Sequence, residues 1–239
     1  MEALDPIPVA TGSVRVVFTD RSDGDFRVRV RPPLERQAEQ ARVASLAERR
    51  GAIAAGPWTS LRQVHGARTV LVTSAGDQAD AEADAAVTTA ASAPISVLIA
   101  DCAPVVLVAE SGVAVAHAGW RGLVNGVVAD AGATLRAVGG APIAAHIGPC
   151  IGPAAYEFGA EDLARMTNVF GSAVASETAE GRPALNVAAA VAVACEQAGW
   201  PEPPAAPHCT SDLGWFSHRT RGDAERQTAV AWIEPHPSS

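Results

Sequence analysis

PISVLIADCAPVVLVAESGVAVA, residues 94–116, contains three short apolar runs separated by polar residues. The runs span 94–100, 103–109 and 112–116; each is rich in β-branched side chains, and none carries a charge. Apolar runs of this length are typical of strands that are buried on both faces of a sheet. The segment therefore predicts the central strands of a layered domain.

The sequence on either side alternates between helical and strand patterns. Three helices are expected, at 34–50 with Gly51 as the stop signal, at 120–138 and at 186–199. Further strands are expected at 14–18, 27–31, 68–73, 143–147 and 228–233. This order predicts an α+β (mixed α/β) fold, a single layered α/β sandwich domain with mixed sheets. We expect one domain over residues 1–239, with flexible tails at 1–12 and 235–239.

Composition narrows the classes of function. A chain of 239 residues that is 48% hydrophobic can bury a large core. The net charge of -8 gives no general attraction to nucleic acids or anionic membranes, so small molecules are the expected partners. No leader pattern or long apolar run is present, which predicts a cytoplasmic protein. All 18 basic residues are arginine, which excludes Schiff-base lysine chemistry, and the four cysteines are expected to be free thiols.

Three side chains that can bind a metal or react with a substrate stand out. Cys102 follows the first apolar run and Asp101, His117 follows the third run, and His65 precedes Gly66. Each alone has a plain structural interpretation, because free cysteine is often buried and an isolated histidine usually satisfies local hydrogen bonds. Together, two imidazoles and one thiolate form a ligand set that suits zinc. We therefore predict that the three side chains converge.

A site with three protein ligands leaves one position of a tetrahedral zinc ion open. An open position distinguishes a catalytic zinc, because water bound there loses a proton near neutral pH. The spacings, 37 residues from His65 to Cys102 and 15 from Cys102 to His117, match no short zinc motif. The prediction of a catalytic zinc therefore rests on the ligand types, and copper is a second possible occupant.

Five short motifs are distributed along most of the chain. In order they are RQVHG at 62–66, ADCAPVVL at 100–107, HAGWRGL at 117–123, IGPCIGPAAYEF at 147–158 and CTSDLGWFSHR at 209–219. Their order and separation resemble the laccase-domain proteins, the YfiH-like family of purine nucleoside phosphorylases formerly called multicopper polyphenol oxidases. In that family the histidine of QVHG, the cysteine of ADC and the histidine of HAGWRG form the zinc site. The resemblance implies that His65, Cys102 and His117 are the metal ligands and catalytic residues.

The resemblance further implies a zinc-dependent purine nucleoside phosphorylase. Such an enzyme uses inorganic phosphate to split adenosine, inosine, guanosine or methylthioadenosine into base and a ribose 1-phosphate, and family members also deaminate adenosine. Arg62, Arg121 and Arg219 are candidate phosphate ligands, because guanidinium groups bind phosphate through paired hydrogen bonds. Gln63 is a further candidate substrate-binding residue. Two segments at the ends of the chain, FTDRSDGDFRVRV and SHRTRGDAERQ, depart from the family pattern and affect substrate contacts rather than ligands.

Two other enzymatic functions could use the same residues. With Cys102 as a thiolate nucleophile and His117 as its base, the chain would be a cysteine-dependent amidase that edits a peptidoglycan precursor. A polyphenol (laccase-type) oxidase must hold several copper ions through many histidines, and six histidines and two methionines are few for that task. A non-catalytic partner of cell-envelope proteins would have no need to gather a thiol and two imidazoles.

Overall fold

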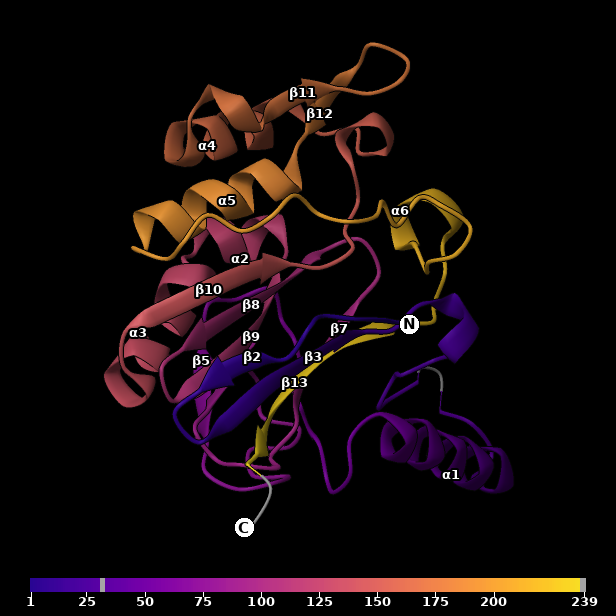
Figure 1. Ribbon diagram of the computed structural model, residues 1–239. Coiled ribbons are helices and arrows are strands. Elements are labelled where there is room, and N and C mark those ends of the chain that lie inside the picture. Colours follow the sequence, from indigo (N-terminus) through magenta and orange to yellow (C-terminus); the bar gives the residue numbers. More distant parts are fainter. Residues whose placement is uncertain (31–32, 237–239) are drawn as a thin grey trace.

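The computed structural model describes residues 1–30 and 33–236, which form two large sheets flanked by helices (Figure 1). The first sheet has the order β1 (Glu2–Ala3), β3 (Gly12–Phe18), β13 (Gln227–Pro235), β7 (Ile95–Ile99) and β4 (Thr59–Ser60), with β2 (Ile7–Val9) paired to β3. The second has the order β10 (Pro142–Ile147), β8 (Ala103–Ala109), β9 (Gly112–Ala118), β6 (Ala85–Thr88) and β5 (Thr69–Val72). A small third sheet pairs β11 (Ala175–Glu177) with β12 (Pro183–Leu185).

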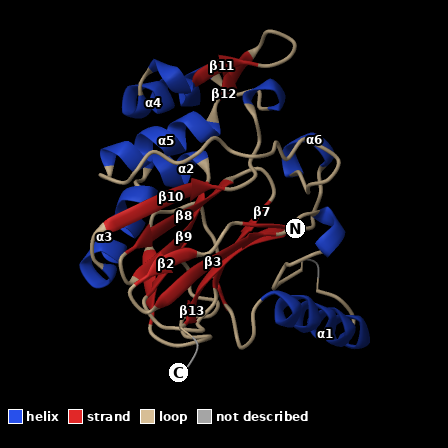
Figure 2. Cartoon of the chain, in the orientation of Figure 1, coloured by secondary structure: helices blue, strands red, loops and turns tan. Residues whose placement is uncertain are grey.

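Six α-helices accompany the sheets in the described part of the chain (Figure 2), and they are α1 (Arg36–Ile53), α2 (Trp120–Val124), α3 (Val127–Gly139), α4 (Ala160–Phe170), α5 (Val187–Gln197) and α6 (His218–Arg221). Short 3-10 turns occur at Arg21–Asp23, Pro153–Ala155 and Ser172–Val174. None of the described helices combines the length and the apolar character that a bilayer crossing requires.

The two large sheets pack face to face, and each has helices or aromatic residues on its outer side. Along β8, Val106 and Val108 point into the core between the sheets, whereas Val105 and Leu107 point into a second core beneath α3 and α5. A third, smaller core lies on the far side of the first sheet, against α1 and Trp58. Because β8 and β9 are covered on both faces, their sequences are continuously apolar rather than alternating.

The predicted fold class is confirmed. Most strand pairs are antiparallel, but β4 pairs with β7 and β5 with β6 in parallel, so both sheets are mixed. The three runs of the segment 94–116 form β7, β8 and β9, as predicted. That the chain forms a single domain stays a prediction.

The structure corrects two helix boundaries. Helix α1 continues through Gly51 to Ile53, because a glycine inside a helix costs only about 1 kcal/mol and the backbone turns extended only at Ala54. The helix expected over 120–138 is divided into α2 and α3. Gly126 separates them with a left-handed backbone (φ 89°), a conformation that glycine adopts without strain.

Three other predictions were wrong. The strand expected over 27–31 does not form over 27–30, because α1 binds those carbonyls, as described below, and Arg31 lies outside the described residues. Residues 1–12 are not a free tail, since β1 and β2 pair with β3 through main-chain hydrogen bonds. Pro235 belongs to β13 rather than to a C-terminal tail, and residues 237–239 lie outside the described part.

Candidate metal and substrate site

The register of the second sheet brings three polar side chains to one edge. In the antiparallel pair of β6 and β9, Ala85 lies opposite Ala116, so Asp84, just before β6, lies beside His117 near the end of β9. Cys102 immediately precedes β8, whose first residue pairs with the last residue of β9. Residues far apart in sequence therefore meet because strand pairing fixes where each strand begins and ends.

The carboxylate of Asp84 holds the loop that carries His65. The backbone N–H groups of Val64, His65 and Gly66 all donate to it, at 3.2, 2.9 and 2.7 Å. His65 has a positive φ of 59°, which is uncommon for a residue other than glycine and indicates a conformation imposed by its surroundings. This loop therefore takes its shape from a buried acid rather than from a neighbouring strand.

The same carboxylate fixes the ring of His117. The Nδ1 atom of His117 lies 2.8 Å from Oδ1 of Asp84, and both side chains are buried. Burial would lower the pKa of His117, but the charges of Cys102 and Asp84 raise it to about 9. Because Nδ1 is engaged by the carboxylate, Nε2 is the ring atom left for a ligand, which is the usual arrangement of a metal-binding histidine and its orienting acid.

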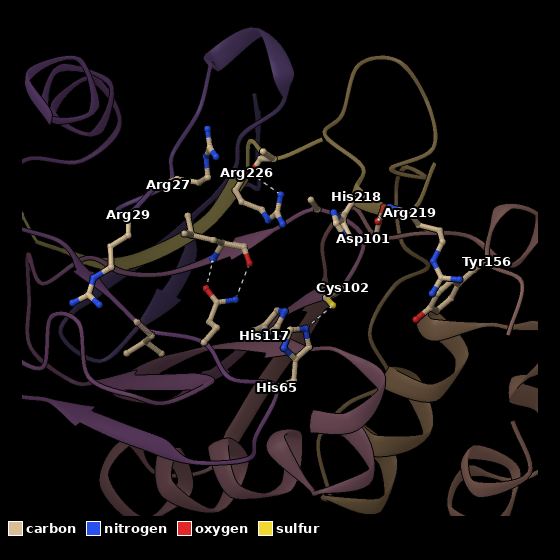
Figure 3. Close-up of a pocket in the computed structure, with 15 residues that line it drawn as sticks. Arg27, Arg29, His65, Asp101, Cys102, His117, Tyr156, His218, Arg219 and Arg226 are labelled. Carbon is tan, nitrogen blue, oxygen red and sulfur yellow. Dashed lines mark hydrogen bonds between the residues drawn. The ribbon is translucent and has the colours of Figure 1, made fainter. Parts of the chain in front are cut away.

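His65, Cys102 and His117 form the predicted cluster (Figure 3), and one potential ligand atom of each lies within 4.8 Å of the others. The Sγ atom of Cys102 is 3.9 Å from Nε2 of His65. Ligands that share a tetrahedral zinc ion at about 2.0–2.3 Å lie about 3.3 to 3.7 Å apart, so small side-chain movements suffice. The donor types and their spacing fit a metal ion, and the three side chains leave one position of a four-coordinate site for another ligand.

Two glycines of the HAGWRG motif allow these side chains to meet. A Cβ atom at Gly119 would lie 2.8 Å from Cδ2 of His65 and 3.0 Å from Sγ of Cys102. A Cβ atom at Gly122 would lie 2.9 Å from the carbonyl oxygen of Gly66. The start of α2 therefore packs directly against the ligand side chains and the ligand loop, and only glycine leaves room for that approach.

Cys102 lies in a strongly electropositive setting. Burial would raise the pKa of its thiol, but the charge of His117 and hydrogen bonds with both histidines lower it to about 6. The other buried cysteines behave in the opposite way, because burial raises the pKa of Cys150 and of Cys195 to about 12. Cys102 is thus poised as a thiolate, the form that binds metals and attacks electrophiles. All four cysteines are free, as predicted.

Asp101 organises the opposite side of the site. Its carboxylate accepts hydrogen bonds from Thr210 Oγ1 at 2.8 Å, from Ser217 Oγ at 2.6 Å and from the backbone N–H of Arg219 at 2.7 Å. Its backbone has a positive φ of 106°, and its carbonyl accepts the N–H of Ile151. The chain reverses sharply at this point, and the C-terminal segment is tied to the end of β7.

A cavity of about 520 Å³ opens between these two frameworks. The ligand cluster forms one side, and Arg27, Arg29, Arg219 and Arg226 line the rest together with Tyr156 and His218 (Figure 3). Burial, followed by the positive charge of Arg27, lowers the pKa of Arg226. Guanidinium groups that repel one another in a partly dry cavity favour the binding of an anion.

Helix α1 positions the arginines of the N-terminal segment. Arg42 donates to the carbonyl oxygens of Arg27 and Val28 at 2.6 and 2.9 Å, and Arg49 donates to the carbonyl of Asp25 at 2.8 Å. These bonds satisfy the carbonyls that a strand partner would otherwise bind. The segment is therefore held over the cavity in an irregular conformation, and the strand pattern of its sequence is not realised.

Four substrate-binding residues were predicted, and the structure brings two of them to the cavity. Gln63 and Arg219 line it, although the amide of Gln63 is engaged at both ends by the backbone of Leu98. Arg62 is half exposed and pairs with Glu82 at 3.2 Å. Arg121 is exposed and lies over the ring of Trp120 at 4.4 Å. Neither of these last two arginines is among the described residues that line the cavity.

Sequence reasoning missed several residues of the site. Asp84 is an isolated acid in an alanine-rich stretch, and only the pairing of β6 with β9 reveals its role. Arg27 and Arg29 were assigned to a half-exposed strand, and Arg226 was not considered. A signal was available for Tyr156, the one tyrosine in the chain, because it lies within the motif IGPCIGPAAYEF.

Comparison with known proteins finds a family model and relatives of similar sequence. The family model described as multi-copper polyphenol oxidoreductase laccase matches residues 34–234. A purine nucleoside phosphorylase of Streptomyces coelicolor is 37% identical over 180 residues, covering 73% of this chain and 74% of that protein. A purine nucleoside phosphorylase of Corynebacterium glutamicum is 30% identical and covers 98% of both chains.

Solved structures share the fold. The hypothetical protein YfiH of Bacillus licheniformis superposes with a TM-score of 0.79 at 21% identity, covering 95% of this chain and 98% of the other. YlmD of Geobacillus stearothermophilus gives a TM-score of 0.76 at 23% identity, covering 95% and 94%. At these identities the likeness establishes the arrangement of strands and helices described above.

Proposed function

Because the chain belongs to the multi-copper polyphenol oxidoreductase laccase family, of which relatives are named purine nucleoside phosphorylases, we propose that it is a zinc-dependent purine nucleoside phosphorylase. Its substrates would be a purine nucleoside and inorganic phosphate, which it would meet in the cytoplasm. The relatives' names suggest the activity, and the geometry of the cavity supplies the chemical argument.

One observation carries the proposal, namely that a metal-binding cluster and a group of arginines line the same cavity. Phosphorolysis needs a site for a doubly charged anion next to a site for a neutral nucleoside. A volume of about 520 Å³ lies within the usual range of small-molecule pockets, about 300–1,000 Å³. The arginines suit phosphate, because several guanidinium donors can share its oxygens.

Arg219 and Arg226 retain donors for this task, whereas Arg27 and Arg29 also pair with Asp25 and Asp80. The guanidinium of Arg219 donates to the carbonyl of Glu157 at 3.1 Å, and its remaining N–H groups are free to serve a ligand. Arg226 uses Nη1 for three carbonyls of its own loop and keeps its other nitrogens. The carboxylate of Asp101 would position Arg219 through its backbone N–H. Phosphate would thus bind between the C-terminal segment and the segment of Arg27.

The cluster of His65, Cys102 and His117 would hold the metal ion. A thiolate and two imidazoles suit zinc, and copper, which the family description names, would accept the same donors. When bound, the ion would supply a Lewis acid that polarises a substrate atom or activates water. The role of Asp84 would be to keep the Nδ1 proton of His117 in place, so that Nε2 faces the ion.

We further propose that the same cavity accepts methylthioadenosine and that it deaminates adenosine. Apolar residues, among them Leu61 and Leu98, line the cavity together with the charged groups, and they would offer a surface for the methylthio group. Deamination requires an activated water near the purine, which the metal cluster could provide. Both activities would depend on the three ligands, whereas only phosphorolysis would depend on the arginines.

The test incubates the purified protein with adenosine or inosine, with and without phosphate, and follows bases and nucleosides by chromatography. We expect adenine or hypoxanthine, with ribose 1-phosphate, only when phosphate is present, and inosine from adenosine in either case. His117→Ala should abolish every product. A folded variant at that position with full activity would contradict the proposal.

A second candidate is a cysteine-dependent amidase, which one observation favours. Cys102, His117 and Asp84 are arranged as a nucleophile, its base and an acid that orients the base, and the pKa of the thiol is about 6. Metal analysis separates the two functions. Stoichiometric zinc that is lost in Cys102→Ser supports the phosphorylase, whereas a metal-free protein that is inactivated by alkylation supports the amidase.

A further inference from the structure

Cleavage of a purine nucleoside leaves negative charge on the purine, and this inference rests on the proposed function. When the bond between C1′ of the sugar and N9 breaks, its electron pair remains on the base. A hydrogen-bond donor at N7 stabilises that charge, and N7 is an acceptor in both adenine and guanine rings. The site therefore needs a donor that reaches the base and remains protonated.

Tyr156 supplies the one hydroxyl group among the described residues that line the cavity. Its ring lies under the guanidinium of Arg219, with Cζ 4.7 Å from the ring centroid, and contacts Phe158 edge-on at 5.3 Å. Phe158 in turn contacts Trp120 edge-on at 5.5 Å. The ring is thus fixed on two sides.

The hydroxyl of Tyr156 faces the cavity. Figure 3 shows the oxygen turned toward the side on which Cys102 lies, away from the backbone that carries the ring. Burial raises the pKa of Tyr156 to about 12, so the group stays a donor throughout the physiological range. The neighbouring guanidinium of Arg219 favours negative charge near the ring and thereby strengthens the O–H as a donor.

Other candidate donors have other tasks. Both ends of the Gln63 amide bind the backbone of Leu98, at 2.8 Å each. Arg226 and Arg27 form the cationic group that suits phosphate, and His65 and His117 belong to the metal cluster. A neutral hydroxyl suits a neutral purine ring, and Figure 3 shows Tyr156 beside Arg219 and across from the metal cluster, so a base bound between the cluster and Arg219 would lie near the hydroxyl.

We propose that the Tyr156 hydroxyl donates a hydrogen bond to N7 of the bound purine and stabilises the base as a leaving group. In the reaction the C1′–N9 bond breaks and a bond forms between a phosphate oxygen and C1′. The hydrogen of the hydrogen phosphate ion passes, through water, to the departing base. Tyr156 keeps its own proton, so atoms and charge balance without another reactant.

The test compares two nucleosides with Tyr156→Phe, which keeps the ring against Arg219 and Phe158. In inosine the base leaves as an anion that a hydrogen bond at N7 stabilises, whereas 7-methylguanosine already carries a positive charge and a methyl group at N7. We expect kcat with inosine to fall about 100-fold, the size of effect seen when one hydrogen-bond donor to a developing negative charge is removed, and kcat with 7-methylguanosine to change less than about threefold. The KM for phosphate should stay the same.

Each outcome is decisive. Equal losses with both nucleosides, or a raised KM for phosphate, would show that the variant disturbs Arg219 and would overturn the role of the hydroxyl. Unchanged activity on inosine would also overturn it. If the wild-type enzyme cleaves neither nucleoside in phosphate, the proposed function fails and this inference with it. Zinc content and the melting temperature of the variant, both expected to match the wild type, establish that the site is intact.

Discussion

Two aspartates hold the two sides of the cavity, and they do so differently. Asp84 is fully buried and binds one side chain, His117, together with three consecutive backbone N–H groups of the ligand loop. Asp101 is slightly exposed and binds two hydroxyl groups and one backbone N–H, all from the C-terminal segment. Asp84 therefore fixes the proposed metal ligands His65 and His117 at one edge of the second sheet, whereas Asp101 joins distant parts of the chain.

The difference teaches how one cavity can have a rigid side and an adjustable side. A buried carboxylate paired with a histidine has few alternatives, because any movement leaves a charge without partners. Thr210 and Ser217 are neutral hydroxyl donors, and the loss of either one leaves the carboxylate of Asp101 with two other hydrogen bonds. We expect the metal side to fail abruptly when it is altered and the substrate side to fail gradually.

Asp84→Asn should produce the largest effect. The amide removes the charge that pairs with His117 and presents donors toward N–H groups, so we expect zinc affinity to fall at least about 10- to 100-fold. Loss of a buried charge partner should also lower the free energy of unfolding by about 3 kcal/mol. Zinc competition titration and thermal unfolding followed by circular dichroism measure the two effects. Asp5→Asn, at an exposed position between β1 and β2, is the matched control and should change neither.

Removal of a cavity arginine should have the next largest effect. Arg226→Ala is expected to raise the KM for phosphate about 10- to 100-fold, the amount that charged hydrogen bonds contribute, while zinc content stays constant. Initial rates at varied phosphate concentration test this. Arg62→Ala, outside the cavity, should leave the KM within about threefold of the wild-type value. Equal effects of the two substitutions would argue against a phosphate site among the cavity arginines.

Ser217→Ala should have a smaller effect, because it removes one hydrogen-bond donor to Asp101 and leaves His65, Cys102 and His117 unchanged. We expect kcat/KM to fall about 5- to 30-fold, equivalent to about 1–2 kcal/mol, through a misplaced Arg219. Full zinc occupancy is expected, in contrast to Asp84→Asn. A variant that loses zinc would show that the two sides of the cavity are not independent.

The smallest expected effect concerns the pKa of the Cys102 thiol and needs no substitution. In metal-free protein, the thiolate fraction of Cys102 rises with pH and reaches one half near pH 6, because its pKa is lowered to that value. The alkylation rate with iodoacetamide should therefore be near its maximum at pH 7. Cys150 and Cys195, with pKa values raised to about 12, should remain unmodified. Mass spectrometry of digested protein identifies the labelled residue, and a midpoint near pH 9 would contradict the electrostatic setting described here.

Much of the fold follows from local patterns in the sequence. The segment 94–116 predicts three buried strands because each run is apolar on both faces, and two of the proposed metal ligands lie at the ends of those strands. Cys102, His117 and His65 could be named because two imidazoles and a thiolate together suit zinc and because the motifs that carry them resemble those of the YfiH-like family. Their convergence is confirmed by the structure.

The parts that could not be predicted depend on contacts between distant segments. Nothing near Asp84 in sequence indicates that it binds His117, because the register of β6 and β9 creates that contact. The alternating pattern of 27–31 indicates a strand, but Arg42 of α1 takes the carbonyls of Arg27 and Val28. Of the three arginines proposed for phosphate, Arg219 lines the cavity, whereas Arg62 and Arg121 lie outside it, since position in a motif does not determine which guanidinium faces the cavity.

Gly119 illustrates a further kind of dependence. It contributes no donor, charge or apolar surface, yet a single added carbon would touch both His65 and Cys102. A larger residue therefore does not fit at this position. A search for chemically active side chains would not identify it. Any redesign of this site must keep position 119 free of a side chain.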